Sequence, residues 1–162
     1  MRACLMNPIA DAVRLNSATE LAMRLYRLHE AGQDYARELI TLSEFTGRAL
    51  TRFDVDAAFG SVAPETFAAG LLVDRTKIPR DLSEPEMLEL LGRVCTSNGT
   101  EFQIGYWLNC LEVNTGDAQI SGLVFWPGEY FRDGNNSREM SPSEMLAVAL
   151  ANGRRADPGA SR

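Results

Sequence analysis

One stretch, residues 100–116, constrains the fold of this chain more than any other. Its sequence, TEFQIGYWLNCLEVNTG, places large apolar side chains around most of a helix at about 100° per residue. A surface helix needs only one apolar face, whereas a helix that is apolar nearly all round is packed from several sides. At about fourteen residues, the apolar stretch is too short to span a bilayer. We therefore predict an all-α fold: a compact single-domain helical bundle with a central buried helix near residues 101–114.

Capping signals delimit the other helices. A Ser or Thr followed three positions later by Glu or Gln marks a helix start, and a Gly marks a helix end. The sequence therefore predicts helix starts at Ser17, Ser83, Thr100 and Ser141, and helix ends at Gly32, Gly47, Gly116 and Gly153. Asp117, and either Asp54 or Asp56, are expected to be further capping residues.

The chain has the length of one ordinary domain. Its middle, residues 74–82, carries no helical pattern and is expected to be a linker. We predict a single helical domain over residues 1–153, in which this linker joins an N-terminal helical segment (residues 1–73) to a C-terminal helical segment (residues 83–153). The last residues, 154–162, are expected to form a disordered tail.

Negative charge is concentrated in the second half of the chain. The formal net charge is −6, and from Glu84 to Asn152 there are ten acidic residues against three basic ones. A nucleic-acid binder normally has a basic face, so this distribution argues against that class. It favours a basic protein partner, because complementary fields speed association. Solubility alone is the commoner explanation of a modest negative charge and stays open.

No familiar catalytic motif is present in the sequence. The single histidine, His29, has no second imidazole with which to hold a metal, and the glycine loops of nucleotide-binding proteins are missing. The sequence around Ser61 matches the GxSxG motif only in part. We therefore predict a protein that is not an enzyme and has no cofactor. The alternative is a small helical enzyme whose site, drawn from His29, Asp54 and Asp56, is assembled only by folding.

A calcium loop is partly matched by residues 133–144. Asp133, Asn135 and Ser137 fall at its first, third and fifth positions, and Glu144 falls at its twelfth. Arg138 stands at the sixth position, where a glycine must make the sharp turn. No metal site is predicted, and the capping signal at Ser141 explains Glu144 as well.

The three cysteines are odd in number, far apart and not in a CxxC pair. We expect buried free thiols in a reducing compartment, and hence a cytoplasmic protein without a membrane segment. Polar residues interrupt residues 1–13 before any signal-peptide core forms, so no secretion signal is expected. Met6 is an alternative start of translation.

The most aromatic segment is LVFWPGEYF, residues 123–131. For most of its rings, packing in the core is the favoured interpretation. Aromatic side chains beside acids on an irregular turn also suit a partner-binding surface. The polar stripe of the predicted central helix would extend such a surface, or it is only the solvent edge of that helix. The candidate partner-binding residues are Glu101, Asn109, Glu112, Trp126, Glu129, Tyr130 and Asp133.

The run DAQISGLVFWPGEYF at residues 117–131, followed by SPSEML at 141–146, resembles a pattern of small bacterial proteins. In those proteins an Ile-Ser-x-Leu-x-Phe-Trp-Pro segment precedes a short Ser/Thr-Pro-x-Glu helix. Several of them resemble immunity proteins of polymorphic-toxin and contact-dependent systems. The resemblance covers residues 117 to about 150, and it carries over no functional residues. Fifteen Arg against one Lys also suggest a GC-rich bacterial genome.

The resemblance implies a toxin-neutralising immunity protein that binds and blocks a cognate bacterial toxin through an acidic surface. On this hypothesis the carboxylates of Glu101, Glu112, Glu129 and Asp133 occupy a basic cleft, and Trp126 anchors the contact. The expected partner is thus a basic toxin domain, with no nucleic acid and no membrane involved. Besides the enzyme, the other alternative is a structural or adaptor interaction module. The sequence does not determine the oligomeric state.

Overall fold

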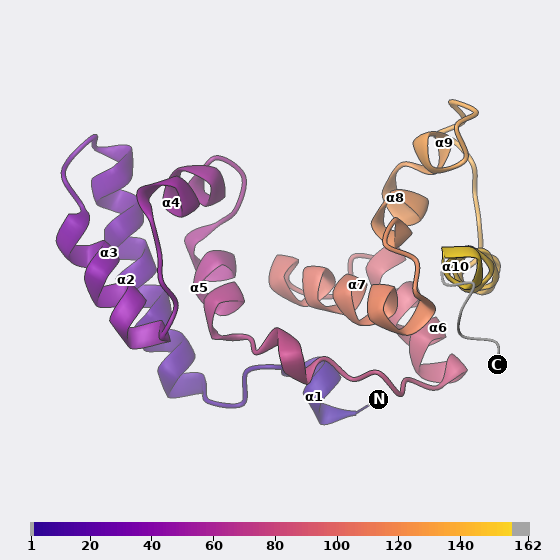
Figure 1. Cartoon of the computed structure of the whole chain (residues 1–162), viewed down its shortest axis with the longest axis horizontal. Coiled ribbons are helices and arrows are strands. Elements are labelled where there is room, and N and C mark those ends of the chain that lie inside the picture. The colour runs from indigo at the N-terminus through magenta and orange to yellow at the C-terminus, as the bar shows by residue number, and fades with distance from the viewer. Residues whose placement is uncertain (1, 157–162) are drawn as a thin grey trace. The chain divides into compact units, whose positions relative to one another are not determined.

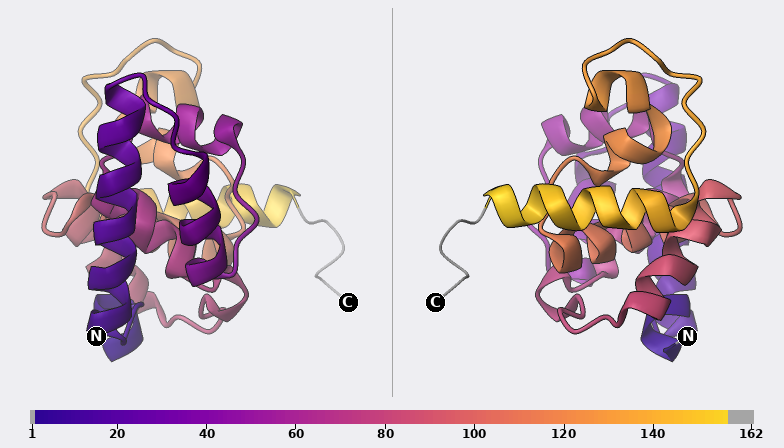
Figure 2. Two further views of the ribbon diagram at one scale, coloured as in Figure 1. Left: turned by 90° about the vertical axis from the view of Figure 1, so that its left-hand side faces the viewer. Right: turned by 90° about the vertical axis from the view of Figure 1, so that its right-hand side faces the viewer.

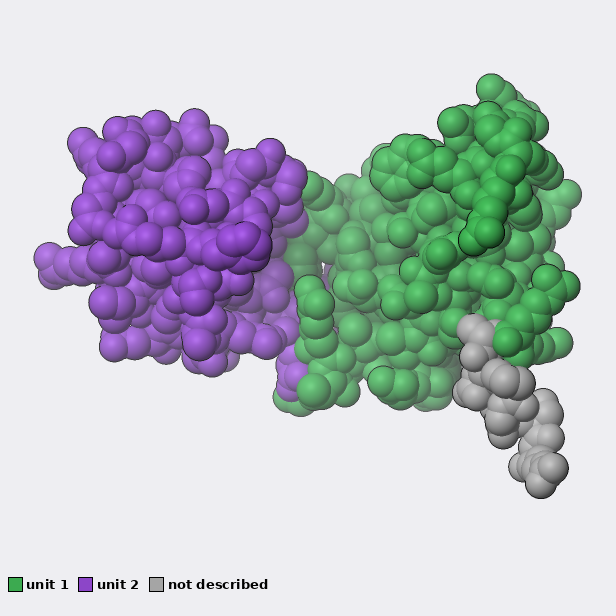
Figure 3. Space-filling model, turned by 45° about the horizontal axis from the view of Figure 1, so that its top comes forward, with its two compact units in different colours: residues 1, 75–162 green, residues 2–74 purple. Residues whose placement is uncertain are grey.

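The computed structural model describes residues 2–156, all of whose regular secondary structure is helical. The predicted all-α fold class is therefore confirmed. The chain forms two compact units, coloured separately in Figure 3: unit 2, from Arg2 to Asp74, and unit 1, from Arg75 onward. The boundary between them falls at the start of the predicted linker, residues 74–82. That the two halves make one domain over residues 1–153 stays a prediction.

Unit 2 is built around one long helix (Figure 1). Its helices are α1 (Ala3–Met6), α2 (Ala12–Glu30), α3 (Ala36–Thr46), α4 (Arg52–Phe59) and α5 (Pro64–Leu72). Both α3 and α5 pack against α2. The fully buried Ala18 and Ala22 lie on α2 within the core cluster, together with Leu25. Small side chains there let neighbouring helices approach closely, because they add little bulk between the backbones.

The start of α2 differs from the prediction. The helix begins five residues before Ser17, because Asp11 is the N-cap and accepts a hydrogen bond from the backbone N–H of Arg14 at 2.9 Å. An aspartate caps as well as a serine does, so Ser17 lies inside the helix and the helix start predicted there is wrong. Gly32 and Gly47 do follow the ends of α2 and α3 in left-handed backbone conformations (φ +62° and +71°), as predicted.

The capping role expected of Asp54 or Asp56 belongs to Asp54. Its Oδ2 accepts hydrogen bonds from the backbone N–H and the hydroxyl of Thr51, at 2.7 and 2.6 Å, which completes a capping box at the start of α4. These bonds stabilise the ionised carboxylate and hold the pKa of Asp54 below its usual value. Asp56 takes no part in the cap, and its carboxylate is used elsewhere.

Unit 1 begins with a 3₁₀ turn, η1 (Arg75–Lys77). Its helices are α6 (Glu84–Cys95), α7 (Glu101–Thr115), α8 (Ile120–Phe125), α9 (Pro127–Tyr130) and α10 (Pro142–Ala156). Helix α7 contacts α6, α8 and α10, and the right-hand view of Figure 2 shows α10 crossing in front of it. Trp107, Cys110 and Leu111 of α7 are fully buried. The prediction of a central buried helix is thus confirmed, and its apolar circumference is explained by neighbours on several sides.

The end of α10 corrects a second prediction. The helix does not stop at Gly153 but continues to Ala156, so the first three residues of the predicted disordered tail are helical. Residues 157–162 lie outside the described chain. Gly153 is needed for close packing: a Cβ there would lie 1.9 Å from the carbonyl oxygen of Thr115, at the end of α7. The glycine signal predicts a helix stop, whereas in the structure it marks a helix crossing.

The cysteines are less buried than expected. Cys110 is buried in α7, but Cys4 and Cys95 are exposed, so the prediction of buried thiols is wrong for two of the three. Cys95 lies in the last turn of α6, where its Sγ is 3.7 Å from the sulfur of Met145. Each helix within residues 2–156 is too short or too polar to span a bilayer.

We expect Gly153→Ala to destabilise unit 1 by about 2–3 kcal/mol, because the new methyl group forces the end of α7 away from α10. The matched control is Gly105→Ala on α7, where nothing lies within 4 Å of the added Cβ. That change should stabilise the protein by up to about 1 kcal/mol. Urea unfolding followed by tryptophan fluorescence tests both, since Trp107 and Trp126 belong to unit 1. Equal stability of the two variants would contradict the role of Gly153.

Thr51→Ala should raise the pKa of Asp54 towards its ordinary value, because it removes the hydroxyl that stabilises the carboxylate. With its folded pKa below its unfolded pKa, Asp54 adds stability above the unfolded pKa. That contribution is lost as the pH falls through the folded pKa. A carboxyl NMR titration measures the change. Glu144, whose pKa is lowered by the backbone N–H and hydroxyl of Ser141, is the internal control and should not move.

Candidate partner-binding surface

A sharp corner between α8 and α9 presents two aromatic side chains to solvent. Pro127 occupies the first turn of α9, and the preceding Trp126 leaves the helical conformation (φ −137°, ψ 61°). Proline disfavours a helical residue before it, so the chain turns at this point. Trp126 is 54% exposed and Phe125 is 43% exposed, with their rings 5.6 Å apart in an edge-to-face arrangement. We call Phe125 and Trp126 the aromatic pair.

The aromatic pair corrects the favoured interpretation of the segment 123–131. Leu123 is fully buried, as a core residue should be, but Phe125 and Trp126 are exposed. A six-residue helix can bury only one side. Ile120 and Leu123 take the buried side of α8, which leaves Phe125 and the following Trp126 exposed. The sequence singles out Trp126 as a candidate but not Phe125. The signal that could have found Phe125 is its position directly before the Trp-Pro turn.

A shallow depression lies beside the corner. It has a volume of about 330 Å³ and is lined by Ala118, Gln119, Ser121, Gly122, Glu129 and Tyr130. Glu129 is exposed and Tyr130 is half-buried. A Cβ at Gly122 would lie 3.9 Å from the ring of Tyr130, so the missing side chain leaves the ring open to the depression. We call this hollow the α8–α9 depression.

A buried carboxylate supports the depression from below. Asp117 is only 1% exposed, and Tyr130 donates its hydroxyl to Asp117 Oδ2 at 2.7 Å. Asp117 Oδ1 accepts hydrogen bonds from the backbone N–H of Gln119 and from Asn152 Nδ2, each at 2.9 Å. Asp117 thus caps the short turn before α8, as predicted, whereas the N-cap residue of α8 itself is Gln119. Burial, reinforced by the Asp117 carboxylate, raises the pKa of Tyr130, so its hydroxyl stays a donor.

Asp133 lies on the loop that follows α9. Its carboxylate accepts from the backbone N–H of Asn135 at 2.9 Å and pairs with Arg138, whose guanidinium lies 4.4 Å from the centre of the Phe131 ring. The first of these bonds and the nearby cation lower the pKa of Asp133. Its charge is thus compensated within the loop, which weakens it as a contact for a partner.

In the partly matched calcium loop, the carboxylates at the first and twelfth positions bind other groups of the protein. Asp133 pairs with the guanidinium of Arg138 instead of facing a metal ion, and Glu144 accepts from the N–H and hydroxyl of Ser141 at 2.8 and 2.7 Å, capping α10. Across residues 2–156, no group of three or more His, Cys, Asp or Glu side chains is placed to hold a metal.

The other three candidate residues lie on α7. Glu101 and Glu112 are exposed, and Asn109 is half-buried. The polar stripe of α7 is therefore accessible, as a binding role would require. The structure divides the seven candidates between two elements of unit 1: α7 carries three of them, and the segment from Trp126 to Asp133 carries four.

Unit 2 brings together two residues of the alternative, enzymatic site. His29 Nε2 lies 3.0 Å from Asp56 Oδ1, and Tyr35 donates its hydroxyl to the same oxygen at 3.3 Å. Asp54 does not join them, because it caps α4. The second ring nitrogen of His29, Nδ1, is buried without a hydrogen-bond partner among the described residues. Both nitrogens therefore face protein groups, and neither is presented to a substrate.

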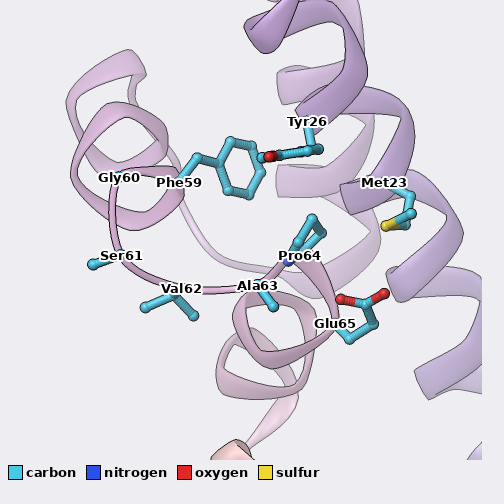
Figure 4. Close-up of a pocket in the computed structure, with 9 residues that line it drawn as sticks. All are labelled: Met23, Tyr26, Phe59, Gly60, Ser61, Val62, Ala63, Pro64 and Glu65. Atoms are coloured by element: carbon cyan, nitrogen blue, oxygen red, sulfur yellow. The ribbon is translucent and has the colours of Figure 1, made fainter.

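A second depression lies between the α4–α5 loop and α2, with a volume of about 430 Å³. Figure 4 shows it lined by Met23, Tyr26, Phe59 and the segment from Gly60 to Glu65. The rings of Tyr26 and Phe59 meet edge to face at 5.1 Å. Ser61 lies on its rim and donates its hydroxyl to the carbonyl of Ala57 at 3.5 Å. This serine belongs to a turn, as a Gly-Ser loop predicts.

Tyr130→Phe should destabilise unit 1 by about 2 kcal/mol, because a buried carboxylate loses one of its donors. Tyr26→Phe is the matched control, since no hydrogen bond of its hydroxyl is found within residues 2–156. It should change stability by less than about 0.5 kcal/mol. Urea unfolding followed by circular dichroism measures both variants. A Tyr130→Phe protein as stable as the control would show that Asp117 does not depend on this bond.

The α8–α9 corner, with its aromatic pair and its depression, is the region of unit 1 best suited to contact another molecule. Its residues come from one short, continuous segment and are held in place by Asp117. Comparisons of this chain with protein-family models, with curated proteins and with solved structures found no match.

Proposed function

We propose that this protein binds another protein through the α8–α9 corner, and that the partner is a basic bacterial toxin which it neutralises. The observation that carries the proposal is the exposed aromatic pair, whose Trp126 stands three residues before the exposed Glu129 of α9. Large aromatic side chains dominate the energy of protein interfaces when they are buried by a partner. Two adjacent exposed rings, with an exposed acidic residue nearby in the chain, suit an interface with an aromatic centre and a charged edge.

The rigidity of the corner supports a binding role. Asp117 makes hydrogen bonds to three places: the backbone at the start of α8, the side chain of Tyr130 on α9, and the side chain of Asn152 on α10. A surface that is already ordered loses less conformational entropy on binding, so more of the contact energy appears as affinity. The aromatic pair lies between two of these fixed points.

The choice of a toxin as partner rests on the resemblance and on charge. The motif that resembles immunity proteins, Ile120 to Pro127, coincides with α8 and the corner. Its exposed large apolar residues are Phe125 and Trp126, which have no role in the core of unit 1. The excess of acidic residues between Glu84 and Asn152 favours a basic partner. An adaptor role would use the same surface with a different partner.

The enzymatic alternative is favoured by one observation, the 3.0 Å contact of His29 with Asp56. A histidine held by a carboxylate is a common general base. Here Asp56 accepts from Nε2, which leaves Nδ1 as the nitrogen that would act, and Nδ1 is buried. The geometry therefore suits a structural contact better than catalysis.

The test compares Trp126→Ala with Phe53→Ala, a change of another large exposed ring on α4 of unit 2. Partners are captured from the source cells with tagged protein, identified, purified and titrated. We expect Trp126→Ala to weaken binding about 30-fold, or about 2 kcal/mol, and Phe53→Ala to leave it unchanged. Association should slow as salt is added.

Neutralisation is read separately, by co-expressing the captured protein with each variant. The wild type and Phe53→Ala should restore growth if the partner is toxic, and Trp126→Ala should restore it less. A captured partner without toxicity would support the adaptor alternative. Binding that is equally strong in both variants would overturn the assignment of the α8–α9 corner.

A further inference from the structure

The α8–α9 depression combines three features in one place. Glu129 supplies an exposed carboxylate, Tyr130 supplies the side of an aromatic ring, and Gly122 leaves that ring uncovered. Ser121 and Gln119 add neutral polar groups to the lining. The hydroxyl of Tyr130 points away to Asp117, so the ring and not the hydroxyl is what the depression offers.

Within residues 2–156, the exposed carboxylate of Glu129 has no paired cation, in contrast to two other acids of unit 1. Asp133 pairs with Arg138, and Glu89 pairs with Arg93 at 2.9 Å. Among the described residues, no Arg, Lys or His pairs with Glu129. An exposed carboxylate beside an aromatic ring therefore remains available to a cation from outside.

This protein already binds arginine side chains in the same way at three other places. Arg138 lies over the ring of Phe131, 4.4 Å from its centre, and pairs with Asp133. Arg52 lies over the ring of Tyr35, 4.7 Å from its centre, and pairs with Asp34. Arg93 pairs with Glu89 and lies 5.9 Å from the centre of the Trp107 ring. In all three cases one carboxylate and one ring hold one guanidinium. The α8–α9 depression has the carboxylate and the ring without the guanidinium.

We infer that the α8–α9 depression receives an arginine side chain of the protein partner. The inference rests on the proposed function, and it names the chemical group that the corner recognises. A guanidinium can stack on the Tyr130 ring while it donates hydrogen bonds to Glu129, whereas an ammonium makes a point contact only. The aromatic pair then covers the neighbouring apolar surface of the partner.

The first experiment probes the depression with a small ligand. ¹⁵N-labelled protein is titrated with N-acetyl-L-arginine amide and, separately, with N-acetyl-L-lysine amide. We expect saturable shifts of the amide signals of Ser121, Gly122, Glu129 and Tyr130, and tighter binding of the arginine compound. Shifts spread over many acidic residues, or equal binding of both compounds, would overturn the inference.

Two variants change the depression in different ways. Glu129→Gln removes the charge and keeps the shape, and it should weaken the arginine compound about fivefold. Gly122→Leu fills the hollow in front of the Tyr130 ring and should abolish the saturable shifts. The matched control, Glu139→Gln, removes one exposed carboxylate from the α9–α10 loop of the same unit and should change nothing. If Glu139→Gln weakens binding as much as Glu129→Gln, only general charge attraction is at work.

The captured partner separates this inference from the proposed function. If Trp126→Ala weakens the partner but Glu129→Gln and Gly122→Leu do not, the corner binds a protein and the arginine site is wrong. If all three variants weaken the partner and Glu139→Gln does not, both proposals are supported. If none of them has an effect, the proposed surface fails together with the inference. Glu129→Gln keeps the test valid even if Gly122→Leu fails to fold.

Discussion

The C-terminal region of unit 1 depends on the hydrogen bonds of one buried carboxylate, that of Asp117. An ionised group taken out of water is costly unless hydrogen bonds replace its hydration. Asp117 obtains them from the backbone of Gln119, the hydroxyl of Tyr130 and the amide of Asn152. Because these donors belong to three different segments of the chain, one side chain fixes the start of α8, the end of α9 and the last turns of α10.

The same junction explains the glycines beside it. Gly116 precedes Asp117 with a left-handed backbone (φ +75°), and Gly153 follows Asn152 in α10. A Cβ at Gly153 would overlap the Thr115 carbonyl. Helix α10 can therefore come close enough for Asn152 to reach Asp117 only because residue 153 is a glycine. The hydrogen bond and the close packing of the two backbones therefore require each other.

Charge in this protein is used in two ways, which a net charge does not distinguish. Glu144 caps a helix, Asp133 pairs with Arg138, and Asp117 is buried. These acids contribute to folding and little to the outer field. Glu101, Glu112 and Glu129 are exposed, and they are the candidate carboxylates that a partner could reach. The acidic character that a partner meets thus comes from fewer residues than the composition suggests.

Local signals in the sequence determined much of the fold. The apolar circumference of residues 101–114 specified a helix with neighbours on several sides, and capping residues such as Ser83, Thr100 and Ser141 specified helix starts, because both effects act within a few residues. The turn at Trp126-Pro127 in the candidate site was equally predictable, because a proline acts on the residue directly before it. Tertiary structure alone decided that Asp56 meets His29 and that Tyr130 bonds to Asp117. Tertiary structure also decided the role of Gly153. In the sequence, a glycine that ends a helix cannot be told from a glycine that lets another backbone approach. Those outcomes depend on which residues, distant in the chain, come into contact in the folded protein. A local sequence pattern does not contain this information.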